Sequence, residues 1–197
     1  DPGGDRCVDR GGDDLAPGEA IRDREKAARG GIAMHVFLTG PVQIGKSTLI
    51  AAALDAIEPE RLGGFRTVSA KPEADGSRSV YLHPAAAQDL FCNAHNRVGI
   101  RRPALGIASF PDAFETAGLA DAEDCDLILM DEIGRMERHA DAYSARIRTL
   151  LDGTIPILGV VQKKADTPLA AAIRSHPNVC LLEVSAENRD NLLPEIL

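Results

Sequence analysis

The fold is decided by residues 40–47, which read Gly40-Pro41-Val42-Gln43-Ile44-Gly45-Lys46-Ser47. This stretch matches the pattern G-x-x-x-x-G-K-[ST], in which backbone N–H groups and the start of a helix surround a phosphate group. The apolar run from His35 to Thr39 precedes it and predicts a buried strand. The segment from Ser47 to Ile57 follows it with apolar residues at i, i+4 and i+7, the spacing of one helix face. A strand, this loop and a helix in that order predict a phosphate-binding loop.

The residue types in the loop suit a nucleoside triphosphate with a magnesium ion. Gly45 lets the backbone approach a phosphate, Lys46 places positive charge on the β- and γ-phosphates, and the Ser47 hydroxyl can ligate Mg²⁺. Gln43 stands where such loops often have glycine. Because a positive φ costs such a residue about 1 kcal/mol, we expect the loop to keep Gln43 out of the left-handed region. The predicted nucleotide-binding residues are Gly40, Pro41, Val42, Gln43, Ile44, Gly45, Lys46, Ser47 and Thr48.

Two adjacent acids, Asp131 and Glu132, end the second informative stretch, a run that begins at Asp126. The run is apolar on both faces, which predicts a central strand of a parallel sheet. An acid at the carboxyl end of such a strand, facing the loop, holds Mg²⁺ in phosphate-binding-loop enzymes. The second acid can orient and deprotonate a water for attack on the γ-phosphorus. We therefore predict Ser47 and Asp131 as metal ligands and Glu132 as the general base.

Phosphoryl transfer also needs positive charge on the leaving phosphates. Arg135 lies just past the acidic pair and is the first choice for this role beside Lys46. Weaker candidates are Arg66, Arg101 and Arg102. Gln162 follows the apolar run from Ile155 to Val161, and it would lie near the γ-phosphate if that strand separates the loop strand from the Asp131 strand. Catalytic roles are therefore predicted for Lys46, Glu132 and Arg135.

Strands and helices alternate along the rest of the chain. Beyond the elements above, we expect strands over residues 64–70, 79–82 and 179–184, the first two forming a hairpin around Asp75-Gly76. We expect helices over residues 111–119, 140–151, 169–174 and 188–196, the last with Ser185 as its N-cap. Residues 83–109 have no clear pattern. The alternation predicts an α/β domain with a mainly parallel sheet and helices on both faces.

Composition sets the remaining expectations. The 197 residues are 44% apolar and 26% charged, which fits one globular domain at residues 34–197. Residues 1–33 have few large apolar side chains, and we expect them to form a disordered N-terminal tail. A net charge of −8 argues against nucleic acid as a partner, and no run is long enough to span a membrane. The four cysteines lack paired spacing, so we expect reduced thiols in a cytoplasmic protein, and we expect a monomer.

Four stretches together resemble one known family, that of cancer-related nucleoside-triphosphatases. They are residues 40–48, Gly64-Phe65-Arg66-Thr67, Met130-Asp131-Glu132-Ile133-Gly134-Arg135-Met136-Glu137 and Glu183-Val184-Ser185-Ala186-Glu187-Asn188-Arg189-Asp190. The resemblance covers residues 34–197 and implies a RecA-like or AAA-like P-loop fold. It implies slow hydrolysis of several nucleoside triphosphates, ATP and GTP among them, to diphosphate and phosphate. It also gives Lys46, Ser47, Asp131 and Glu132 the roles derived above.

A GTP-binding switch module is an alternative. Asp131-Glu132-Ile133-Gly134 fits the pattern D-x-x-G, and Lys163-Lys164-Ala165-Asp166 is close to the guanine-reading pattern N-K-x-D. In this interpretation Asp166 would accept two hydrogen bonds from guanine and give strong base selectivity. The long interval between Lys46 and Asp131, and lysine in place of the asparagine, argue against it.

A nucleoside or small-molecule kinase is a third possibility. Residues 83–109, with Arg101 and Arg102, would then form an arginine-bearing lid over an acceptor. The order of the strands separates these alternatives. A strand between the loop strand and the Asp131 strand favours the RecA-like interpretation, whereas direct neighbours favour a GTPase or a kinase.

Overall fold

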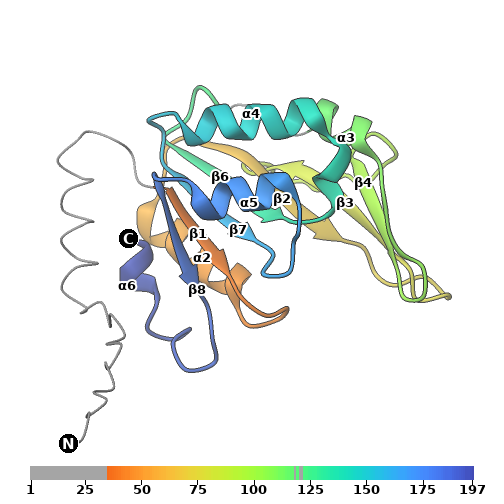
Figure 1. Ribbon diagram of the computed structural model, residues 1–197, viewed down its shortest axis with the longest axis horizontal. Helices are drawn as coiled ribbons and strands as arrows, with labels where there is room; N and C mark the ends of the chain where they lie inside the picture. Colours follow the sequence, from red (N-terminus) through yellow and green to blue (C-terminus); the bar gives the residue numbers. More distant parts are fainter. Residues whose placement is uncertain (1–34, 118, 120–121) are drawn as a thin grey trace, which may run out of the picture. The chain divides into compact units, whose positions relative to one another are not determined.

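The computed structural model describes residues 35–117, 119 and 122–197 (Figure 1). The tail expected at residues 1–33, and Met34, lie outside the described residues. The described strands form one eight-stranded sheet in the order β5-β4-β3-β2-β6-β7-β1-β8. The strands are β1 (His35–Thr39), β2 (Leu62–Ser69), β3 (Arg78–Pro84), β4 (Arg97–Arg102), β5 (Gly106–Ser109), β6 (Leu127–Ile133), β7 (Ile157–Val161) and β8 (Val179–Glu183). The helices are α2 (Lys46–Ile57), α3 (Pro111–Ala117), α4 (Asp141–Leu151), α5 (Pro168–Ser175), α6 (Leu193–Ile196) and the 3₁₀ helix η1 (Met136–His139).

The sheet has two parts, which we name the parallel half and the antiparallel extension. The parallel half consists of β2, β6, β7, β1 and β8, which pair in parallel. The antiparallel extension is residues 78–109, whose strands β3, β4 and β5 continue the sheet beyond β2. The sheet is therefore mixed, and the expected parallel arrangement holds for the parallel half alone. Strands β4 and β5 were not foreseen because they are short and their few apolar side chains form no sustained alternation.

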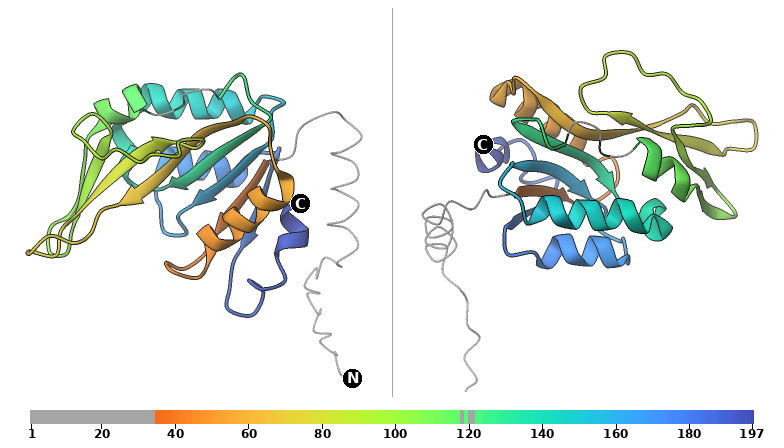
Figure 2. Two further views of the ribbon diagram at one scale, coloured as in Figure 1. Left: turned by 180° about the vertical axis from the view of Figure 1, so that it is seen from behind. Right: turned by 90° about the horizontal axis from the view of Figure 1, so that it is seen from above.

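Helices cover both faces of the parallel half, as predicted (Figure 2). Helices α4 and α5 lie with η1 over one face, and α2 and α6 lie over the other, while α3 lies beside α4 against β3 and β4 of the extension. Alternate residues of β6 enter the two cores, with Ile128 and Met130 on the α4 side and Leu127 and Leu129 on the α2 side. Because side chains alternate along a strand, Asp131 continues the row of Leu127 and Leu129 on the α2 side.

Strand β6 runs further than predicted. It continues through both acids to Ile133, whereas we expected it to end at Asp131. Its register with β7 shifts between Met130 and Ile133, where Met130 pairs with Gly159 and Ile133 pairs with Val161. Such a register shift interrupts the regular alternation of side chains. The direction of Glu132 is therefore set by the local backbone and by its neighbours rather than by the pattern of the strand.

The C-terminal helix is shorter than predicted. Helix α6 begins at Leu193, whereas we expected the helix to begin at residue 188. The Asn188 side chain accepts a hydrogen bond from the Ser185 N–H and donates one to the Glu183 carbonyl, both at 2.8 Å. Ser185 Oγ accepts from the Glu187 N–H at 3.2 Å, so Ser185 closes a turn instead of capping a helix. None of the helices in the described part of the chain is long and apolar enough to cross a membrane.

Candidate active site

The loop from Gly40 to Gly45 joins the end of β1 to the start of α2. Gly40 has a φ of 141°, and a Cβ atom at this position would lie 2.5 Å from the carbonyl oxygen of Val184. Gly45 is the N-cap residue of α2 and has a φ of 111°. A side chain would be strained at both positions, and at Gly40 it would also collide with the backbone. The two glycines of the motif are therefore required by the path of the loop.

Gln43 adopts the left-handed conformation that we expected the loop to avoid. Its φ is 62°, so the expectation was wrong. Val42 and Gln43 form the turn at the top of the loop, and both are exposed to solvent. The turn takes a positive φ at its second residue whatever side chain stands there. Gln43 therefore carries a backbone cost of about 1 kcal/mol that glycine would avoid.

Lys46 and Ser47 open helix α2. The Lys46 ammonium donates hydrogen bonds to the carbonyl oxygens of Gly40, at 3.1 Å, and of Pro41, at 2.7 Å. These bonds fold the side chain back over its own loop. Ser47 lies exposed in the first turn of α2, which contains no acidic residue. The first turn of a helix has N–H groups without partners inside the helix, so this end of α2 favours an anion.

Asp131 lies at the same edge of the sheet as the loop. Strand β7 lies between β1 and β6, and the three strands are parallel, so their carboxyl ends share one edge. Asp131 also lies on the side of the sheet that α2 covers. Burial, together with the negative charge of Glu132, raises the pKa of Asp131 to about 6, although the positive charges of Arg66 and Lys46 oppose the shift. The structure thus brings the predicted metal-ligand acid and the loop lysine into electrostatic range of each other.

Glu132 borders a small cavity at the carboxyl end of β6. The cavity has a volume of about 10 Å³, and its lining includes Glu132, Gln162, Arg101 and Thr67. This volume is close to what one water molecule needs. Gln162 follows β7, and the position of β7 between β1 and β6 meets the condition that we set for Gln162. The predicted base and the predicted polar sensor therefore share one cavity.

Arg66 is the arginine that the strand register places beside Asp131. The two residues are direct partners in the pairing of β2 with β6. The guanidinium donates from Nη2 to the carbonyl oxygen of Ala85. Its Nε is buried and has no hydrogen-bond partner among the described residues. A positive charge with an unused donor thus lies next to the metal-ligand candidate.

Arg135, our first choice, lines the same small cavity as Glu132, and its guanidinium is held by the segment after β7. Its Nη2 donates to the carbonyl oxygen of Lys164 at 2.8 Å, and its Nε lies 3.6 Å from the Asp166 carboxylate. Arg101 and Arg102 lie exposed at the end of β4 as part of the sheet. In this structure the first choice is therefore tied to the segment after β7, and the weaker candidate Arg66 is beside Asp131.

The residues of the guanine-reading pattern are paired with other side chains. Asp166 accepts a hydrogen bond from Arg138 at 2.7 Å and also lies near Arg135. A hydrogen bond from its own backbone N–H, together with these two arginines, holds the pKa of Asp166 below its usual range. Lys163 forms an ion pair with Glu183 of β8. The carboxylate that would read guanine is thus bound to arginines of η1 and the preceding turn.

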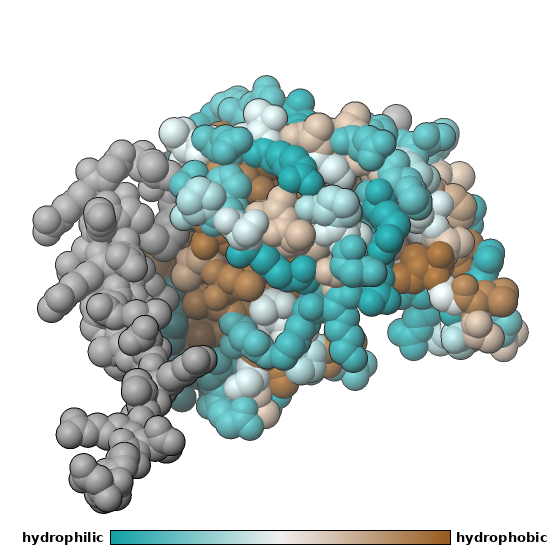
Figure 3. Space-filling model, in the orientation of Figure 1, coloured by the Kyte–Doolittle hydropathy of each residue, from teal (hydrophilic) through white to brown (hydrophobic). Residues whose placement is uncertain are grey.

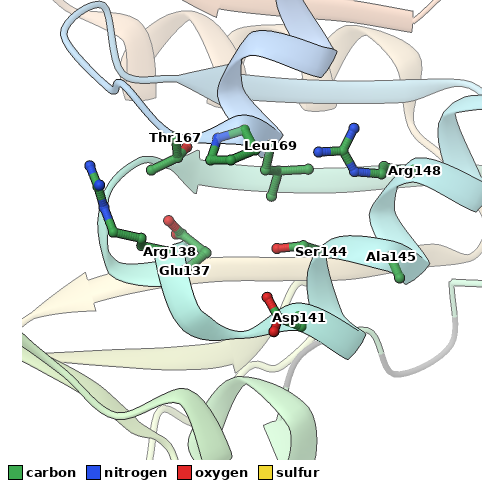
Figure 4. A pocket seen from close by; sticks show the side chains of 9 residues that line it. Glu137, Arg138, Asp141, Ser144, Ala145, Arg148, Thr167 and Leu169 are labelled. Carbon is green, nitrogen blue, oxygen red and sulfur yellow. The ribbon is translucent and has the colours of Figure 1, made fainter.

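Two buried polar residues near the site were missed by the sequence reasoning. Glu137 and Thr167 are 4% and 3% exposed and line a groove of about 200 Å³ between α4 and the start of α5 (Figure 4). Burial raises the pKa of Glu137 to about 7, and the charge of Glu132 adds to the shift. A signal existed in the run Met130 to Glu137, which resembles the family over its full length. Nothing in that run shows which of its charged residues is buried.

Comparisons with known proteins show the family and the fold of this chain. A family model described as NTPase matches residues 35–197. The cancer-related nucleoside-triphosphatase homolog of Bos taurus is 30% identical over 186 residues, covering 84% of this chain and 96% of the relative. Nucleoside-triphosphatase THEP1 of Methanosarcina barkeri is 28% identical over 169 residues, covering 81% and 92%. The crystal structure of THEP1 from Aquifex aeolicus has the same fold, with a TM-score of 0.60 at 21% identity over 83% of this chain and 97% of that chain.

Proposed function

This chain belongs to the NTPase family and is a nucleoside-triphosphatase, and we propose that it hydrolyses several nucleoside triphosphates to diphosphate and phosphate in a Mg²⁺-dependent reaction. The observation that carries the proposal is the shared edge of β1 and β6. The loop 40–47 and the Asp131-Glu132 pair lie at that edge, separated by β7. A triphosphate held by the loop would extend its γ-phosphate toward the acidic pair.

Mg²⁺ would be held by the Ser47 hydroxyl and the Asp131 carboxylate. Both donors are oxygens, and Mg²⁺ usually takes one or two protein ligands together with phosphate oxygens and water. Asp131 fits this role because its raised pKa reflects burial of a charge that Arg66 and Lys46 do not fully compensate. Within the described residues, no group of three or more His, Cys, Asp or Glu side chains could hold a metal without the nucleotide. When bound, Mg²⁺ supplies positive charge to the β- and γ-phosphate oxygens.

Glu132 is the proposed general base, and Gln162 is proposed to orient the attacking water. Their positions support these roles, since Glu132 directly follows Asp131 in β6 and Gln162 follows β7, both at the sheet edge that carries the loop. A base within hydrogen-bond reach of the water accepts its proton as the oxygen attacks the γ-phosphorus. Gln162 has an amide that can both donate and accept, so it can hold a water in one orientation.

Positive charge on the transferring phosphoryl group is proposed to come from Lys46 and from one arginine. The position of Arg66 beside Asp131 supports Arg66 for this role. Arg135 stays a candidate, provided that nucleotide binding releases it from Lys164 and Asp166. Either arginine would act on charge that develops in the transition state, where such a contact has its largest effect on rate.

The strand order supports a RecA-like or AAA-like assignment within the P-loop proteins. Strand β7 separates β1 from β6, which is the arrangement that we expect for this class. The pairing of Asp166 with Arg138 gives a guanine-specific switch no support, because that carboxylate is already occupied. Residues 97–109 pair as strands of the sheet, which gives no support to a lid of the kinase type.

Phosphate release from ATP, GTP, CTP and UTP, each with Mg²⁺ or with EDTA, tests the proposed function. We expect release from all four nucleotides with Mg²⁺ and none above background with EDTA. Lys46→Ala serves as the inactive control. Activity with GTP alone would contradict the broad specificity, and a burst of product that needs an added nucleoside acceptor would indicate a kinase. Full activity in EDTA would overturn the role of the metal.

A further inference from the structure

Both backbone groups of Gly134, two residues after Glu132, are held by buried side chains. The Gly134 N–H donates to Glu137 Oε2 at 3.0 Å, and the Gly134 carbonyl accepts from Thr167 Oγ1 at 3.2 Å. A Cβ atom on Gly134 would collide with the side-chain amide of Gln162. We name Glu137, Thr167 and Gln162 together the Gly134 clamp.

The clamp is anchored in the surrounding structure. Thr167 is also the N-cap residue of α5 and accepts a hydrogen bond from the Ala170 N–H at 3.2 Å. Gln162 donates its own N–H to the Ile133 carbonyl at 2.8 Å. Figure 4 shows the Glu137 carboxylate directed toward Thr167, between η1 and the start of α5. The backbone just beyond Glu132 is thus fixed from η1, from the end of β7 and from the start of α5.

The position of the clamp argues for a role beyond folding. Two of its members, Glu137 and Gln162, line the same small cavity as Glu132. Glu132 itself lies where the register with β7 shifts, between Met130 and Ile133, so the regular pairing with β7 is interrupted there. A side chain in such a segment is not aimed by the strand, so its direction depends on what holds the residues that follow. Catalysis is sensitive to this, because a displacement of about 1 Å can cost 10²-fold in rate.

We propose that Glu137, together with Thr167, is a positioning residue that aims Glu132 at the attacking water by fixing the backbone of residues 133–134. The inference rests on the proposed role of Glu132 as the base. It assigns a function to a buried acid that touches neither the nucleotide loop nor the metal-ligand candidates. The charged and titratable groups around Glu137 include Glu132 of β6, Arg101 of β4, Arg135 before η1, Arg138 of η1, and Asp141, Tyr143 and Arg148 of α4.

The test compares Glu137→Ala with the isosteric Glu137→Gln in the full-length protein. Alanine removes the acceptor for the Gly134 N–H, so we expect kcat to fall roughly 10- to 100-fold with KM within about 2-fold of the wild type. Glutamine keeps an acceptor oxygen at this place, so we expect it to restore most of kcat. Thr167→Val tests the other half of the clamp, with Thr167→Ser as its conservative partner, and we expect the same pattern with a smaller loss.

A double variant separates positioning from simple destabilisation. If Glu137 acts through Glu132, adding Glu137→Ala to Glu132→Gln lowers kcat no further. Leu151→Ala is the matched control, because Leu151 is fully buried at the other end of α4 and its truncation destabilises the core without touching the clamp. We expect Leu151→Ala to lower Tm and to leave kcat unchanged at temperatures well below Tm.

The possible results test the role of the Gly134 clamp and the role of Glu132 as the base separately. Unchanged kcat in folded Glu137→Ala and in Thr167→Val would overturn the clamp, as would a further loss of kcat in the double variant. If Glu137→Ala does not fold, the decision falls to Thr167→Val and its double variant with Glu132→Gln. Full activity of Glu132→Gln alone would overturn the base assignment in the proposed function, which is a separate failure.

Discussion

The parallel half and the antiparallel extension meet at β2 and are stabilised differently. All five residues of β7 in the parallel half are buried, whereas β5 at the edge of the extension has none. Large apolar side chains are exposed in the extension, with Phe91 at 73% and Leu105 at 79%, and Figure 3 shows hydrophobic surface at that end. The candidate site uses the carboxyl edge of the parallel half and one arginine of the shared strand β2. Chemistry that needs fixed geometry is thus built on the strands that are buried on both faces.

The largest effect is expected at the carboxyl end of β6. Glu132→Gln keeps the shape of the side chain but removes the base, so phosphate release falls roughly 10²- to 10⁴-fold while nucleotide binding persists. Lys46→Ala is the contrasting variant, and it loses tight triphosphate binding as well. Single-turnover phosphate release and titration with a fluorescent nucleotide measure the two properties. Undiminished phosphate release by Glu132→Gln would show that Glu132 is not the catalytic base.

The next contrast is in how stability depends on pH, between Glu137 of η1, which follows β6, and Asp75 of the turn before β3. The pKa of Glu137 in the folded protein is raised to about 7 by burial, above its ordinary value of 4.5, so the native state holds a proton that the unfolded chain has released. Stability is therefore fully present below pH 4.5 and falls as the pH rises toward 7. Glu137→Gln has no carboxyl group to ionise and therefore avoids this loss. At pH 8 its free energy of unfolding exceeds that of the wild type by up to about 3 kcal/mol, the free-energy equivalent of the pKa shift.

Asp75, in the turn between β2 and β3 that leads into the extension, behaves in the opposite sense. Hydrogen bonds from Ser77 hold the pKa of Asp75 below its ordinary value. The stabilising effect of Asp75 is therefore present at neutral pH and is lost as the pH falls through its folded-state pKa. Urea unfolding of the wild type and Glu137→Gln at pH 5 and pH 8 measures the first dependence. Urea unfolding of the wild type and Asp75→Asn at pH 5 and at about pH 2.5 measures the second, because the pKa of Asp75 in the folded protein lies below its ordinary value of 3.8. If the difference in unfolding free energy between Glu137→Gln and the wild type does not grow with pH, the raised pKa of Glu137 is contradicted.

A smaller loss of kcat is expected when single arginines of the two parts are replaced. Arg66→Ala removes positive charge next to Asp131, so we expect kcat to fall roughly 10- to 100-fold, within the range for one transition-state contact. Arg102→Ala removes an exposed charge at the end of β4, and we expect kcat to change less than about 2-fold. Steady-state phosphate release on both variants and on Arg135→Ala makes the comparison. A large loss in Arg135→Ala with none in Arg66→Ala would assign the cation to Arg135.

The smallest effect concerns positive φ in the two parts. Gln43 has a φ of 62° in the phosphate-binding loop, and Gly106 has a φ of 78° at the start of β5 with open space around it. Gln43→Gly relieves the strain but gains freedom in the unfolded chain, so stability rises by less than about 1 kcal/mol. Gly106→Ala introduces the same strain and costs about 1 kcal/mol. Denaturant midpoints of both variants measure the difference, and a destabilised Gln43→Gly would show that the loop does not carry the strain.

The parts of the fold that were predicted correctly have local signals. The hairpin of β2 and β3 was foreseen from Asp75-Gly76, and β7 from a continuous apolar run. The failures have equally local reasons. Strands β4 and β5 are half exposed and have no alternation to detect, and the helix expected from residue 188 is replaced by a turn that Asn188 closes through the backbone around Ser185.

The sequence by itself determined the phosphate-binding loop, the strand before it, the helix after it and the acid pair near the end of β6. Glycine freedom, apolar period and the order of residue types act over a few neighbours, so a pattern can show them. Only the tertiary structure decided that β7 separates β1 from β6, that Arg66 lies beside Asp131 while Arg135 is tied to Asp166, and that Gly134 is held by Glu137. These relations depend on strand pairing, burial and side-chain packing between separate segments of the chain, which no local pattern encodes.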